Sequence, residues 1–431
     1  MEHPDWTWVL HSSLLIAAIY GRFTKVWSVR NLDIALLIGL SPALQGAGSN
    51  PWFLYAVTAM IAIRLLADSR FRRRPRIDPN LNPYGLSFLC AAAFIVLTVN
   101  ASISIPPSVG TAVEAAAVLA GDTTTQSDPD PTATIVTMPA VAISKNIQKR
   151  ADRAGGEELP PDPEATLMLA MRIVAVVSHA AVVLGLIILG YRRFGSGTLG
   201  LSMATLYLLL PCTAKEVHNV SHALPAAFVV WAFVAYRRPA IAGSMLAFAT
   251  GALFSTAFLI PLWAVFYGRK RVTSFFAGLV ATAAVLMAPL LWTSTPWLLM
   301  RKASGSINST VFDLFNGTAN STAALSHPAL RLVVMVVFGC ALVCVVAWPR
   351  TKQLSDLIAG STVLVVLSQL WYPRQLGLYV IWYLPLLLMV IFRPRLRHLE
   401  EEEREGIAEA AALAPTPQKT SGRVPISPLR R

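Results

Sequence analysis

The chain has 431 residues, of which 55% are hydrophobic and 14% are charged, and its mean hydropathy is +0.56. This composition is typical of a membrane protein and argues against a soluble catalytic domain. The formal net charge of +13 comes from basic residues in short clusters between apolar runs, the pattern of cytoplasmic loops rather than of a nucleic-acid-binding surface. We therefore expect the lipid bilayer as a partner and no nucleic acid.

Apolar runs follow one another along almost the whole chain, with lengths near those needed to cross a hydrocarbon core of about 30 Å. They cover residues 6–20, 34–46, 52–67, 84–105, 164–191, 199–214, 222–236, 240–267, 272–292, 328–348, 354–370 and 377–392. The sequence therefore predicts an all-α fold, a polytopic transmembrane helical bundle with about 11 to 13 spans.

The charges that flank these runs predict their orientation. Acidic Glu2 and Asp5 precede the first run, and Arg22, Lys25 and Arg30 follow it, which indicates a retained helix with its N-terminus outside. Strict alternation then puts the other strong basic clusters on the cytoplasmic side as well. These clusters are residues 70–76, 192–193, 237–238, 269–271, 350–352 and 393–397. We expect a multi-pass protein of the bacterial inner membrane with a cytoplasmic C-terminus.

The run over residues 240–267 is basic at both ends and so must return to the side that it left. Gly251, Ser255 and Thr256 lie at its middle, where they suit a hairpin of two short or re-entrant helices. Such irregular backbone is tolerated at membrane depth only where protein covers it.

Two long connections, residues 101–163 and 293–327, fall on the outer side in this arrangement. In the first, residues 122–131 are rich in Pro, Thr and Asp and predict a flexible segment, whereas residues 135–153 predict an amphipathic helix on the membrane surface. Residues 395–431 form the predicted cytoplasmic tail, which we expect to be partly disordered.

Residues 84–394 resemble the GT-C superfold of membrane glycosyltransferases that use polyprenyl-phosphate sugars, in particular its mannosyltransferase-like branch. Four segments carry the resemblance: GYRRFGSGTLGLSMATLYLLLP, HNVSHALPAAFVVWAFVAYRRP, AGSMLAFATGALFSTAFLIPLWAVFYGRKR and YPRQLGLYVIWYLPLLL. The resemblance implies transfer of a hexose or pentose from the lipid carrier to a glycan, lipid or protein on the outer face.

The chain departs from that superfold in two places. Family members normally carry an acidic residue soon after the first family helix, but here the run over residues 84–105 is followed by a stretch without an Asp. The remaining acidic candidates in this connection are Glu114, Asp122, Asp128 and Asp130. Residues 1–83 form three additional predicted helices with no counterpart in the superfold. Whether the chain is an enzyme therefore stays open.

Transfer of a sugar from a lipid phosphate needs cations near the phosphate and a carboxylate that deprotonates the acceptor hydroxyl. The predicted base is Glu216, Asp122, Asp128 or Asp130, and the predicted phosphate contacts are Arg172, Lys215 and Arg374. His218, His222, Arg301 and Lys302 are further candidates for substrate binding.

Each of these candidates also has a structural interpretation. Lys215 and Glu216 can pair with each other at a polar interfacial turn beside lipid headgroups, and Arg172 can extend to the interface. Glu216, His218 and His222 are also types of side chain that bind divalent metals, so a metal cofactor stays open. His179 is more simply a buried, hydrogen-bonded histidine.

Two other functions are compatible with the same pattern. A catalytically silent scaffold with this fold would explain the missing early Asp. A transporter or flippase of lipid-linked sugars would be expected to show paired broken helices in two related halves, and no such internal symmetry is visible in the sequence.

Overall fold

The computed structural model describes residues 6–46, 51–67, 77–104, 106, 109–121, 131–155, 162–293, 328–348, 352–370 and 379–394. The chain divides into two units, residues 1–394 and 395–431, and all described residues belong to the first. The predicted tail and most of the second long connection therefore lie outside the described residues.

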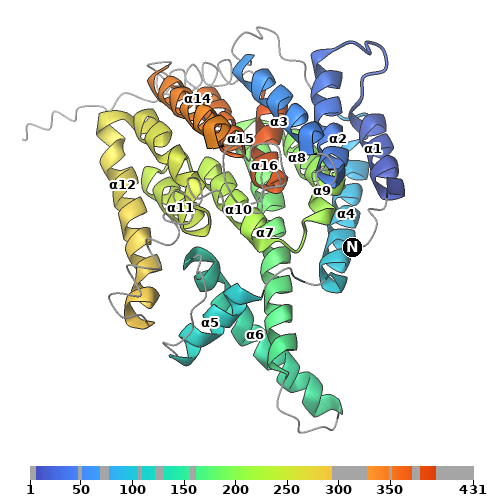
Figure 1. Ribbon diagram of the computed structural model, residues 1–431. Helices are drawn as coiled ribbons and strands as arrows, with labels where there is room; N and C mark the ends of the chain where they lie inside the picture. The colour runs from blue at the N-terminus through green and yellow to red at the C-terminus, as the bar shows by residue number, and fades with distance from the viewer. Residues whose placement is uncertain are drawn as a thin grey trace, which may run out of the picture. The chain divides into compact units, whose positions relative to one another are not determined.

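Every regular element within the described residues is a helix, which confirms the predicted all-α class for that part of the chain. Figure 1 shows their arrangement. The elements are α1 Trp6–Tyr20, α2 Val29–Gly46, α3 Pro51–Leu66, α4 Pro83–Ile103, α5 Gly110–Ala120, α6 Pro131–Gly155, α7 Pro163–Arg193, α8 Gly197–Leu209, α9 Pro211–Lys215, α10 Val220–Val234, α11 Pro239–Ala252, η2 Phe254–Phe258, α12 Leu259–Thr293, α14 Pro328–Ala347, α15 Leu354–Ser368 and α16 Val380–Phe392.

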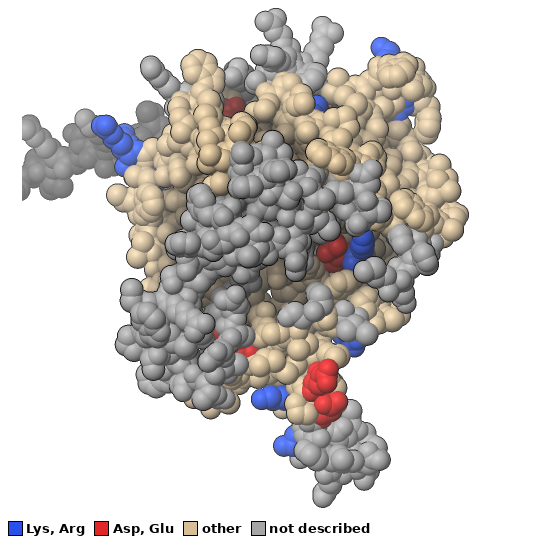
Figure 2. Space-filling view, viewed as in Figure 1, with Lys and Arg blue, Asp and Glu red and all other residues tan. Residues whose placement is uncertain are grey.

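Three helical stretches are long and apolar enough to cross a membrane, judged by length and composition. They are α4, α7 and residues Phe254–Ala288. Many of the other expected spans form apolar helices of 10–17 residues, such as α8 and α10. The described surface in Figure 2 is mostly uncharged, with acidic and basic side chains at scattered positions on this face.

The run over residues 240–267 forms two short helices, as predicted. Helix α11 ends at Ala252, Leu253 is extended, and the short helix η2 leads into α12. Helix α12 then breaks again at Gly268, whose φ of 60° and ψ of −178° are accessible essentially only to glycine. The stretch before Gly268 therefore ends at a basic turn, and a second helical segment, residues 269–293, begins there.

Glycines bring two pairs of helices into backbone contact. A Cβ atom on Gly243 of α11 would overlap the Phe275 carbonyl of α12, and one on Gly278 would overlap the Ala240 carbonyl. Gly190 of α7 and Gly200 of α8 meet in the same way. Close approach through small residues is how helices associate where the hydrophobic effect offers no driving force. These contacts fix the α7–α8 and α11–α12 pairs.

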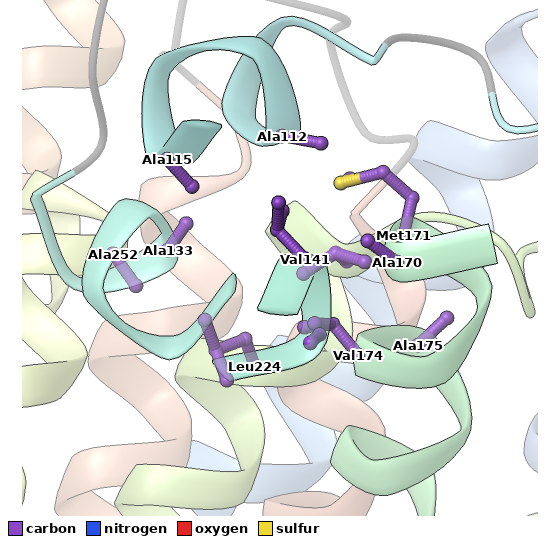
Figure 3. Close-up of a cluster of buried hydrophobic side chains, with 12 residues drawn as sticks. Ala112, Ala115, Ala133, Val141, Ala170, Met171, Val174, Ala175, Leu224 and Ala252 are labelled. Atoms are coloured by element: carbon purple, nitrogen blue, oxygen red, sulfur yellow. The ribbon is translucent and has the colours of Figure 1, made fainter. Parts of the chain in front are cut away.

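Helices α5 and α6 lie within the connection over residues 101–163, beside the N-terminal half of α7 (Figure 1). Helix α6 includes the residues predicted as an amphipathic helix. Its Val141 packs in a buried cluster with Ala170 and Val174 of α7, as Figure 3 shows. One side of this helix is thus covered by protein; its position on a membrane surface stays a prediction.

The described basic turns gather at one end of the helices, called here the basic end. Arg193 at the end of α7 donates to the Val234 carbonyl at the end of α10 (3.0 Å) and lies 4.7 Å above the Tyr236 ring. Arg30 donates to the carbonyls of Tyr20 and Asp78, at 2.8 Å each.

Two further contacts belong to the basic end. The Arg393 guanidinium, which follows α16, donates to the Ser355 carbonyl in α15. Arg64 of α3 donates two hydrogen bonds to the Asp33 carboxylate of α2, at 2.8 and 3.0 Å, and the Asp33 side chain is only 3% exposed. These hydrogen bonds of the four arginines therefore go to backbone carbonyls and to one buried carboxylate.

Candidate functional site

The candidate site lies around a break between α8 and α10, at the end of the helices opposite to the basic end. Leu210 is extended and Pro211 starts the one-turn helix α9, which suits proline because its missing N–H is not needed there. The chain then turns over residues 216–219 before α10 begins at Val220. This irregular backbone places the polar residues of the KEVHN segment outside a continuous helix.

Glu216, Asn219 and His222 form a hydrogen-bonded group at this turn. The Asn219 amide donates to Glu216 Oε2 (3.3 Å) and to His222 Nε2 (3.4 Å). Because Nε2 accepts, a neutral His222 carries its proton on Nδ1, which lies 3.7 Å from Glu216 Oε2. The Asn219 amide thus bridges the carboxylate and the imidazole and holds both side chains in position.

The two partners of Asn219 differ in their access to solvent. The His222 side chain is 3% exposed and its ring meets the Tyr379 ring edge-on, with centroids 4.7 Å apart. The Glu216 side chain is 17% exposed. His218 is half-buried, and its Nδ1 has no hydrogen-bond partner in the described structure. Glu216 is thus the member of the group that an acceptor molecule could reach.

Arg172 is connected to the same turn through the end of α4. Its Nε and Nη2 donate to the Ser104 carbonyl at 3.2 and 3.1 Å. The Ser104 hydroxyl donates to the Asn100 carbonyl (2.8 Å), and the Asn100 amide donates to the Ala214 carbonyl (2.8 Å), two residues before Glu216. A continuous chain of polar contacts therefore joins Arg172 on α7 to the α9–α10 turn.

Lys215 is exposed and its ammonium lies 3.4 Å from the Leu44 carbonyl, near the C-terminal end of α2. The pairing with Glu216 that the sequence allowed is not among the ion pairs of the described residues. Arg172 and Lys215 thus each contact a carbonyl at a helix end, a favourable position for a positive charge.

His179 lies near the middle of α7 and has a structural role. It is fully buried; its Nδ1 lies 2.8 Å from the Tyr207 hydroxyl and its Nε2 lies 3.2 Å from the Val217 carbonyl. The carbonyl can only accept, so Nε2 carries the proton and Nδ1 accepts from tyrosine. This confirms the interpretation of His179 as a buried, hydrogen-bonded histidine.

The predicted site residues that lie outside the described residues are Asp122, Asp128, Asp130, Arg301, Lys302 and Arg374. Glu114, the remaining acidic candidate in the first connection, lies on α5 and is only 2% exposed. Within the described residues, no three His, Cys, Asp or Glu side chains are grouped so that they could hold a metal ion. Glu216, His218 and His222 are not such a group in the described structure.

Asn100, Ser104 and Asn219 were missed as site residues by the sequence reasoning. Asn100 is the one strongly polar side chain near the end of the apolar run over residues 84–105, a signal that could have marked it. Asn219 stands between Glu216 and His222, and its bridging role depends on a turn that the sequence does not reveal.

Comparison with protein-family models and with curated proteins finds no match to this chain.

Proposed function

We propose that the chain is a multi-pass protein of the bacterial inner membrane that transfers a sugar from a polyprenyl-phosphate carrier to an acceptor on the outer face. The observation that carries this proposal is the polar turn at the end opposite to the basic end. If arginine-rich turns face the cytoplasm, Glu216 and Arg172 lie towards the outer side.

In the proposed reaction Glu216 is the general base. The acceptor hydroxyl oxygen attacks the anomeric carbon, the bond from that carbon to the phosphate oxygen breaks, and Glu216 takes the hydroxyl proton. Asn219 and His222 hold the Glu216 carboxylate in place. The polyprenyl phosphate leaves with the electron pair of the broken bond. Arg172 and Lys215 are the cations proposed to stabilise its negative charge.

The proposal also assigns roles beyond the described residues. Arg374, Arg301 and Lys302 are further proposed phosphate contacts, and Asp122, Asp128 and Asp130 are alternative bases. They belong to the outer connections or their edges in the predicted topology.

Full-length protein in proteoliposomes, supplied with polyprenyl-phosphate mannose and native membrane extract as the source of acceptors, tests this function. We expect Glu216→Gln to lower mannose release from the carrier by about 100-fold or more, the usual scale for loss of a general base. Glu164→Gln is the matched control, because Glu164 is an exposed carboxylate in the first turn of α7. Equal release by wild-type protein and Glu216→Gln would remove the proposed base.

A catalytically silent scaffold is the second candidate. The observation that favours it is that Arg172 and Lys215 already contact the carbonyls of Ser104 and Leu44. In that case polyprenyl phosphate does not bind: adding it would leave the unfolding temperature of the wild-type protein unchanged. An increase in that temperature, abolished in Arg172→Gln, would support the transferase instead.

A further inference from the structure

A cavity of about 450 Å³ opens at the basic end, where α10, α12 and the segment before α15 meet. Its size falls in the range of about 300–1,000 Å³ that is typical of small-molecule sites. The nine described residues that line it include five cations and no acidic residue. The cations are Arg237, Arg269, Lys270, Arg271 and Lys352.

Tyr236, Tyr267 and Gly268 set the backbone conformation around this cavity. The Tyr267 hydroxyl donates to the Tyr236 carbonyl (2.7 Å), which ties the end of the first stretch of α12 to the end of α10. The positive φ of Gly268 then ends that stretch, so that Arg269, Lys270 and Arg271 are the first residues of the next helical segment. The N-terminal end of a helix carries a partial positive charge, which adds to that of the side chains.

Lys352 lines the cavity from a third segment of the chain, the one before α15. Its ammonium donates to the Val345 carbonyl at the end of α14 (2.7 Å). Burial lowers the pKa of Lys352, and the charge of the nearby Asp356 opposes this effect. The Asp356 carboxylate itself accepts from the backbone N–H of Gln353 and caps α15. An anion in the cavity would therefore meet cations from three separate segments.

Two exposed apolar side chains of α12, Phe276 and Val280, lie beyond this cavity and are called here the apolar stripe. Arg269, Thr273, Phe276 and Val280 follow one another at spacings of four, three and four residues and so share one face of the helix. Phe276 is 41% exposed and Val280 is 61% exposed. A molecule with a phosphate in the cavity and a hydrocarbon chain on this stripe would satisfy both features, whereas a free inorganic anion would use only the first.

We propose that this cavity at the basic end binds the phosphate of an anionic phospholipid, with an acyl chain along the Phe276–Val280 face. The site is distinct from the turn around Glu216 and does not require sugar transfer; it shares with the proposed function only the placement in a membrane. Basic pockets between helices on the cytoplasmic side are suited to such headgroups.

The test uses the full chain in uncharged detergent micelles, with dioleoyl phosphatidylglycerol as the probe and dioleoyl phosphatidylcholine as the neutral comparison, each measured by native mass spectrometry. We expect phosphatidylglycerol to bind at least about 10-fold more tightly. Removing two cations with K270Q/R271Q should weaken its binding by about 30-fold, since each basic residue near an anionic lipid contributes a factor of about five.

The matched control is R22Q/K25Q, which removes two exposed cations of the same end that do not line the cavity. Binding within twofold of wild type is expected for it; a loss equal to that of K270Q/R271Q would show unspecific attraction and overturn the proposal. K352Q provides a second variant on another segment, expected to weaken binding about fivefold.

Two soluble probes separate the possible sources of the phosphate. Glycerophosphoglycerol, the headgroup without acyl chains, and inorganic phosphate should each bind at least about 10-fold more weakly than the lipid, because neither covers the apolar stripe. Equal affinity for inorganic phosphate would identify a soluble-anion site and contradict the lipid. Glu216→Gln should leave lipid binding unchanged, so this test and that of the transferase can fail independently.

Discussion

Cations contact backbone carbonyls at both ends of the helical bundle, but the basic end also pairs one cation with a buried carboxylate and groups others around a cavity. At the basic end Arg64 is paired with a buried carboxylate and five other cations line one cavity, whereas at the opposite end Arg172 and Lys215 each contact a backbone carbonyl. A cation that neutralises a buried charge should be far more important for stability than one that meets a carbonyl dipole. We therefore expect substitutions of Arg64, Arg172 and Lys215 to lower the free energy of unfolding by successively smaller amounts.

The largest effect is expected for Arg64→Ala. It leaves the Asp33 carboxylate buried without its two guanidinium hydrogen bonds, and loss of one partner of a buried ion pair costs about 3–5 kcal/mol. Chemical unfolding of the full chain in micelles measures the change. The double variant Asp33→Leu with Arg64→Met should recover most of the loss, because it removes both charges. A loss below about 1 kcal/mol for Arg64→Ala would show that the pair is well solvated.

An intermediate effect is expected for Arg172→Ala. Two hydrogen bonds from a charged donor to the Ser104 carbonyl are lost, at a cost of about 1.5–3 kcal/mol in the free energy of unfolding. Asn100→Ala interrupts the same polar chain one step further on and makes a useful second variant. If Arg172→Ala destabilised the protein as strongly as Arg64→Ala, the contrast between the two ends would be lost.

The smallest effect is expected for Lys215→Ala. Its ammonium is exposed and its contact with the Leu44 carbonyl is long at 3.4 Å, so the unfolding free energy should change by roughly 0.5 kcal/mol or less. The same variant should still lower polyprenyl-phosphate binding if Lys215 is a phosphate contact. A large loss of stability without a loss of binding would instead assign Lys215 a structural role.

The sequence by itself determined the all-α class of the described residues, because long apolar runs can satisfy their own backbone only as helices when water is scarce. It also determined the break within residues 240–267, where Gly251, Ser255 and Thr256 interrupt the pattern, and the interpretation of His179. Each of these follows from local composition and needs no knowledge of the neighbouring helices.

Tertiary structure alone decided which polar residues meet. Asn219 bridges Glu216 and His222 only because the chain turns between α9 and α10, and Arg172 reaches that turn only because α4 ends beside α7. The cavity at the basic end combines residues near positions 237, 270 and 352, far apart in the sequence. Charge patterns predicted that these turns would share one side; whether their cations pair, contact carbonyls or surround a cavity depends on distances that only packing sets.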